Sequence, residues 1–245
     1  MNTRTSFGWL FLLALLCWTP LSSQVLAQGD MDGSTENEAP KILLREGAQL
    51  SLQFLPGDAD PVTEDMQQAN ARTYHLEGER GRHEHMDLRL TVSPSTDARS
   101  LDDDGNSSEL DADYVILETG KQVTEDWLQP GTIFGFHHIA LKPDVDRDEF
   151  ERFIRDVWAP TQSDALPDSK IIFLKSIRGD REGEYSFVWI IDSEETRDYY
   201  FPQSGVPSKM YTEFEKGWLW INADDQMGKY VSTEEEGEFT DFVVR

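Results

Sequence analysis

The chain has 245 residues, and its 47 Asp and Glu outnumber its 22 Lys and Arg, which gives a formal net charge of −25. Nucleic acid and anionic lipid surfaces are excluded as expected partners, because both would be repelled by this charge. The single cysteine, Cys17, excludes a disulfide within the chain and a metal site built from cysteines.

The N-terminal residues have the composition of a secretory signal peptide. Arg4 precedes an uncharged stretch whose centre, residues 9–18, is almost wholly apolar, and small residues close it. We predict a signal peptide over residues 1–27, export to the periplasm or the medium, and no membrane attachment after cleavage. A retained transmembrane helix is disfavoured because the apolar centre is about half of the roughly 20 residues that a span needs. A lipoprotein acylated at Cys17 is disfavoured by the two large leucines before it.

Loss of Arg4 with the signal peptide would change the net charge from −25 to −26, since 47 acidic residues would face 21 basic ones. Lysine is also scarcer than arginine, at 8 against 14. Dense carboxylates keep a surface hydrated at high salt, where ions screen their mutual repulsion. Adaptation to salt and simple acidity of an exported protein therefore both explain the composition.

The first half of the mature chain is weakly patterned. Residues 28–40 are polar and acidic and predict a flexible leader, and residues 41–128 predict a strand-rich region interrupted by an acidic loop at 100–113. This region is either a fold of its own or a degenerate copy of the second half. Its expected elements are strands at 49–55, 86–92 and 114–117 and a short helix at 61–72.

The second half, residues 131–245, has clearer periodicity. A helix is expected from Arg147 to Trp158, because Asp146 is a good N-cap and apolar residues recur at helical spacing along one stripe. A second helical region is expected to begin near Ser193 and to resume at Ser208. The expected strands are 132–141, 170–178, 184–192 and 237–244. This order predicts an α+β, ferredoxin-like β-α-β-β-α-β domain with helices on one face of a four-stranded sheet.

Five segments of this half together resemble the dimeric α/β-barrel superfamily, which includes antibiotic-biosynthesis monooxygenases and stress-responsive barrel proteins. These segments are His138–Pro143, Glu149–Phe153, Phe173–Gly179, Tyr185–Ser193 and Arg197–Tyr200. The resemblance implies that the bare sheet face is covered by a second subunit in a homodimer or by a second copy within the chain. It also implies two possible activities, cofactor-free oxygenation and the handling of haem.

Two adjacent histidines are the strongest candidates for a site in the second half. His137 and His138 lie on one expected strand, so one should face the helices and the other the interior of the expected barrel. We expect one of them to line a ligand pocket together with Tyr185, Trp189 and Tyr199. Such a histidine is either a hydrogen-bonded structural residue, a proton-transfer group or a haem ligand.

Two further segments have the residue types of metal sites. His83 and His85 have the spacing that places two imidazoles on one face of a strand, although their neighbours also fit an exposed turn. The acidic loop at 100–113 superficially resembles a calcium loop, but Ser100 and Asp111 stand where two of its defining ligands should be.

The sequence thus favours an exported binding module for a small molecule or a protein, without catalysis. The alternative is an oxygenase or haem-handling enzyme that uses His137 or His138. A bound chromophore that is lost on mutation of these histidines would favour the enzyme.

Overall fold

The computed structural model describes residues 42–55, 71–93, 111–162, 166, 168–232 and 238–245, which belong to one compact unit. The expected signal peptide and leader lie outside these residues. So do residues 61–70 of the expected helix and residues 100–110 of the acidic loop. Within the described ranges, no helix combines the length and the apolar character needed to cross a bilayer.

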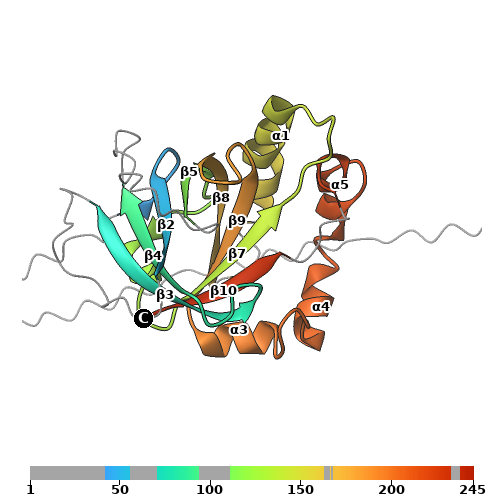
Figure 1. Ribbon diagram of the computed structural model, residues 1–245. Coiled ribbons are helices and arrows are strands. Elements are labelled where there is room, and N and C mark those ends of the chain that lie inside the picture. The colour runs from blue at the N-terminus through green and yellow to red at the C-terminus, as the bar shows by residue number, and fades with distance from the viewer. Residues whose placement is uncertain (1–41, 56–70, 94–110, 163–165, 167, 233–237) are drawn as a thin grey trace, which may run out of the picture. The chain divides into compact units, whose positions relative to one another are not determined.

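Eight antiparallel strands form a closed barrel in the order β10-β3-β4-β2-β5-β8-β9-β7 (Figure 1). Two shorter strands, β1 (Ile42–Leu44) and β6 (Val123–Thr124), form a separate antiparallel pair. The barrel strands are β2 (Gln49–Leu55), β3 (Arg72–Gly81), β4 (Asp87–Ser93), β5 (Ala112–Glu118), β7 (Ile133–Ile139), β8 (Ser169–Arg178), β9 (Tyr185–Ile191) and β10 (Phe239–Val244).

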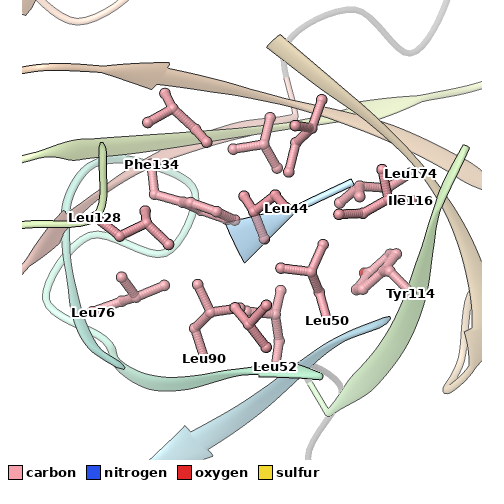
Figure 2. Packing of buried hydrophobic residues seen from close by; sticks show 14 of the residues in the cluster. Leu44, Leu50, Leu52, Leu76, Leu90, Tyr114, Ile116, Leu128, Phe134 and Leu174 are labelled. Atoms are coloured by element: carbon pink, nitrogen blue, oxygen red, sulfur yellow. The ribbon is translucent and has the colours of Figure 1, made fainter. Parts of the chain in front are cut away.

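The barrel interior is filled by apolar side chains from alternate positions of every strand. In β4, for example, Leu88, Leu90 and Val92 are all buried, whereas the residues between them are only half-buried. Leu44 from β1 packs among these interior side chains with Phe134 from β7 (Figure 2). Leucines from the first half of the chain thus share one core with aromatic residues from the second half.

The prediction of a ferredoxin-like β-α-β-β-α-β domain over residues 131–245 is wrong. That prediction made β8 and β10 the edges of a four-stranded sheet, but β8 pairs with β5 and β10 pairs with β3. The sheet continues through the strands of the first half and closes on itself, so the fold is a mostly-β closed barrel with short helices. A closed sheet leaves no edge strand with unpaired backbone groups.

The resemblance to the dimeric α/β-barrel superfamily is wrong for the same reason. The sheet face that was expected to need a second subunit or copy faces the barrel interior, where β2, β4 and β5 contribute the opposing side chains. No ferredoxin-like unit stands alone in the described part of the chain. Homodimer formation stays a prediction.

The helices lie outside the barrel (Figure 1). Helix α1 (Arg147–Phe153) begins where expected, with the Asp146 carboxylate accepting hydrogen bonds from the backbone N–H groups of Asp148 and Glu149. It continues through a wider π-helical turn, η3 (Ile154–Trp158), into α2 (Ala159–Gln162). The ring of Phe150 packs edge-on against Tyr185 of β9 at a centroid distance of 5.0 Å, which fixes α1 on the outer sheet face.

The second helical region is broken into short pieces. Helix α3 (Glu194–Tyr200) and helix α4 (Lys209–Glu215) begin after Ser193 and Ser208, as expected, and each serine hydroxyl caps a backbone N–H group. The chain then forms a 3₁₀ turn, η4 (Leu219–Asn222), and a last helix, α5 (Met227–Tyr230). This segment, residues 208–231, provides the wall of the pocket described below.

Replacing Gly81 with alanine should destabilise the fold by roughly 2–3 kcal/mol. Gly81 ends β3 at a φ of +98°, and a Cβ there would lie 2.1 Å from the carbonyl oxygen of Phe239 on β10. Gly47 is a matched control, because its φ is +80° but no atom lies within 4 Å of its Cβ position. Gly47→Ala should therefore cost only about 1 kcal/mol, from backbone strain. Urea unfolding would measure both, and equal losses would contradict close packing of β3 on β10.

Candidate functional site

A pocket of about 360 Å³ lies on the outside of the barrel, between β7 and β9 on one side and the segment 208–231 on the other. Its lining is predominantly apolar, and its size falls within the range of small-molecule sites. Aromatic side chains from both walls converge on it: Trp158, Trp189, Tyr211, Phe214 and Trp218.

His137 lies in the sheet wall of this pocket, flanked by two phenylalanine rings. Phe187 and Phe239 are its direct cross-strand partners on β9 and β10. Their rings stack on the imidazole at centroid distances of 4.5 Å and 5.6 Å. Burial in these apolar surroundings lowers the pKa of His137 to about 4, so the imidazole is neutral at neutral pH. In the described part of the chain it makes no hydrogen bond to a carboxylate.

Gly135 makes room beside His137 for a second polar side chain. A Cβ at this position would lie 3.1 Å from Oδ1 of Asp241 and 3.6 Å from Nε2 of His137. Asp241 is the cross-strand partner of Gly135 on β10, and burial raises the pKa of its carboxyl. The absence of a side chain at Gly135 thus lets an imidazole and a carboxyl approach the same spot on the outer face.

Trp189 connects the sheet wall to the helical wall. Its indole ring lies 5.7 Å from the rings of both Phe201 and Tyr211, measured between centroids. Its buried Nε1–H finds no acceptor among the residues that the structure describes. A buried donor without a partner carries a free-energy cost, which a ligand or water acceptor would relieve.

His138 points to the opposite side of β7, into the mouth of the barrel. There it lines a separate pocket of about 70 Å³, and its Nε2 lies 3.4 Å from a carboxylate oxygen of Glu184. Burial, together with the charges of Arg181 and Arg82, lowers the pKa of His138 to about 4. Glu238 forms ion pairs with both of these arginines at the same mouth. His138 thus borders both pockets, whereas His137 lines only the outer one.

Of the three aromatic residues that were expected in the pocket, only Trp189 lines it. Trp189 lines the pocket, as expected, but Tyr185 lies in the core between α1 and the sheet, where its hydroxyl donates to Glu151 at 2.8 Å. Burial, and then this hydrogen bond, raise the pKa of Tyr185. Tyr199 lies on α3 with 61% of its surface exposed, outside the pocket lining.

His83 and His85 lie in the turn between β3 and β4 rather than on one face of a strand. His85 has a left-handed backbone, with a φ of +68°, and its side chain is 86% exposed. Within the described ranges no three His, Cys, Asp or Glu side chains gather closely enough to hold a metal ion. Zinc binding by the histidine pair stays a prediction.

Two acidic residues at the end of the acidic loop, which superficially resembled a calcium loop, have structural roles. Asp111 accepts a hydrogen bond from the backbone N–H of Phe54, and Asp113 forms an ion pair with Arg178.

Sequence reasoning missed the helical wall of the pocket. Tyr211, Phe214 and Trp218 are three and four residues apart, and successive ring centroids lie 6.0 and 6.2 Å from each other. Helical spacing gave the signal, since it placed large apolar groups on one face of a short helix. It could not show that this face contacts Trp189 through Tyr211 and leaves a pocket beside that contact, instead of packing tightly along the sheet.

No known protein family, curated protein or solved structure matches this chain.

Proposed function

We propose that this acidic protein is an exported binding module that holds a small molecule with an apolar body in the pocket beside His137, without catalysing a reaction on it. The observation that carries the proposal is the aromatic cavity of about 360 Å³ between β7, β9 and the segment 208–231. Sites for small molecules are concave and mostly apolar, with a few polar groups that fix orientation.

The polar groups in this pocket fit recognition of an apolar ligand. His137 is neutral and flat between Phe187 and Phe239, so it extends the aromatic wall and offers a ring nitrogen. A small molecule is favoured over a protein partner because the aromatic side chains converge on a cavity instead of spreading over the surface.

Catalysis by His137 is not proposed, because the described residues give its imidazole no partner for proton transfer. A general base works together with a group that orients it, and His137 makes no such hydrogen bond within the described chain. The oxygenase and haem-handling activities were implied by the resemblance to the dimeric α/β-barrel superfamily, which the closed barrel contradicts.

Binding can be tested with N-phenyl-1-naphthylamine, a neutral probe whose fluorescence rises in apolar surroundings. We expect saturable fluorescence enhancement with the purified protein and quenching of its tryptophan emission. Ala140→Phe, which places a ring at a residue that lines the pocket, should weaken binding by about tenfold, equivalent to about 1.4 kcal/mol. The reason for the weaker binding is that the introduced phenylalanine ring would occupy space in the pocket that the probe needs.

Ala223→Phe is the matched control, because Ala223 is exposed and does not line the pocket. It should bind the probe as the unchanged protein does, and circular dichroism should show that both variants are folded. Absence of saturable binding, or equal weakening by the two variants, would contradict the proposal.

A further inference from the structure

Of the carboxylate, ammonium and guanidinium groups that could line the pocket, only the negatively charged carboxylates are present among the described residues. Its lining contains the carboxylates of Glu215 and Glu238, and among the described residues that line it there is no lysine or arginine. Glu238 is already compensated by Arg82 and Arg181. Glu215 is half-buried at the end of α4 and forms no ion pair in the described part of the chain. The pocket wall therefore carries one uncompensated negative charge.

This charge lies next to the aromatic rings of the helical wall. Glu215 follows Tyr211 by one helical turn, and its carboxylate adds to the effect of burial in raising the pKa of the Tyr211 hydroxyl. Phe214 precedes Glu215 in the chain, and Trp218 follows it by three residues. The Tyr211 ring faces Trp189 across a centroid distance of 5.7 Å. Glu215 and these aromatic rings thus line the same pocket, and the Glu215 carboxylate is close enough to Tyr211 to affect the pKa of its hydroxyl.

Aromatic faces carry negative partial charge and attract ammonium groups that lie within about 6 Å of the ring centre. A carboxylate adds direct attraction, which is stronger in a pocket shielded from water than on an open surface. The neutral state of His137 leaves no positive charge in the opposite wall to oppose a cation. The formal net charge of −25 also raises the local concentration of cations near the protein.

We propose that the ligand of this pocket is an organic cation, an ammonium group attached to an apolar or aromatic body. The ammonium would lie beside Glu215 and the rings of Tyr211 and Trp218, and the apolar body would contact the wall formed by Trp189 and His137. This inference rests on the proposed function, because it names the class of molecule that the same pocket holds.

The test compares two probes of the same shape that differ in charge. Benzyltrimethylammonium and neopentylbenzene differ by replacement of the ammonium nitrogen with carbon, and both can compete with N-phenyl-1-naphthylamine. We expect the ammonium compound to displace the naphthylamine at a concentration at least about tenfold lower than its neutral counterpart. Raising the salt concentration should reduce this preference, because ions screen the attraction of the carboxylate.

Glu215→Gln should remove most of the preference for the ammonium compound, so that the two compounds compete at similar concentrations. Glu213→Gln is the matched control: its carboxylate is on the same helix, but it is 60% exposed and pairs with Lys216. Equal competition by the two compounds, or equal effects of the two variants, would overturn the inference about charge while leaving the pocket a binding site. Failure of the naphthylamine itself to bind would overturn both proposals.

Discussion

Replacing Phe134 with alanine is expected to lower the free energy of unfolding by about 3–5 kcal/mol. Phe134 lies on β7 and points into the barrel, where only 1% of its surface is exposed. Its neighbours in the interior cluster include Leu44, Leu90 and Leu128 from other parts of the chain (Figure 2). Truncation removes the transfer free energy of the ring and leaves a cavity that these neighbours fill only in part. Urea unfolding followed by circular dichroism would measure the loss.

The same experiment tests the closed barrel. In an open sheet of a monomer, the face that carries Phe134 would be solvated, and its truncation would cost little. Ile177→Ala on β8 is the control, because Ile177 is 39% exposed and surface substitutions usually change stability by about 0.5 kcal/mol or less. Similar small losses for Phe134→Ala and Ile177→Ala would contradict the barrel interior described above.

The stability of the protein should depend on the titration of His137 between pH 6.5 and pH 4. The folded protein binds a proton at His137 with a pKa of about 4, whereas the unfolded chain binds it near 6.5. Between these values the unfolded state holds more protons, so stability rises with pH in this window and is lost as pH falls through it. At about 1.4 kcal/mol per pKa unit, the contribution at neutral pH is on the order of 3 kcal/mol.

The variant His137→Phe isolates this contribution, because a phenyl ring can occupy the same stack between Phe187 and Phe239 without titrating. Carboxylates also titrate near pH 4, so the informative quantity is the difference between variant and unchanged protein. Urea unfolding at pH 7 and at pH 4 should show a smaller loss of stability for His137→Phe. His85→Asn is the control, since the His85 side chain is 86% exposed. Parallel losses for all three proteins would show that His137 is not held in its neutral form.

The acid sensitivity bears on the site as well as on stability. His137 lines the proposed pocket, so its protonation would place a positive charge among aromatic rings. At pH values well above 4 the wall stays neutral, which is the state that the proposed cation requires. Burial also lowers the pKa of His138, but this residue lines the pocket at the barrel mouth as well as the outer pocket, and its imidazole lies beside Glu184.

Local features of the sequence were sufficient to place most elements of the second half. Asp146 and the apolar stripe after it identified α1, because capping and helical spacing act within one turn or two. The glycines at 179 and 183 and the alternation that follows identified the hairpin of β8 and β9. The same reasoning placed His137 and His138 on opposite faces of one strand, since side chains alternate along any strand.

The sequence determined where most strands and helices begin, although it gave no prediction of β1, β3 or β6, and it determined the strong negative charge and the aromatic content from which the pocket is built. Only the tertiary structure decided that β5 joins β8 and that β3 joins β10, which turned an expected open sheet into a closed barrel. The physical reason is that strands pair through backbone N–H and C=O groups, which every residue other than proline carries alike. A strand apolar on both faces, such as β7, fits equally well between helices and a second sheet or between helices and a barrel interior. The pocket likewise depends on the distance between the rings of Trp189 and Tyr211. Tyr211 lies 22 positions after Trp189 in the chain, and no local sequence pattern connects the two residues.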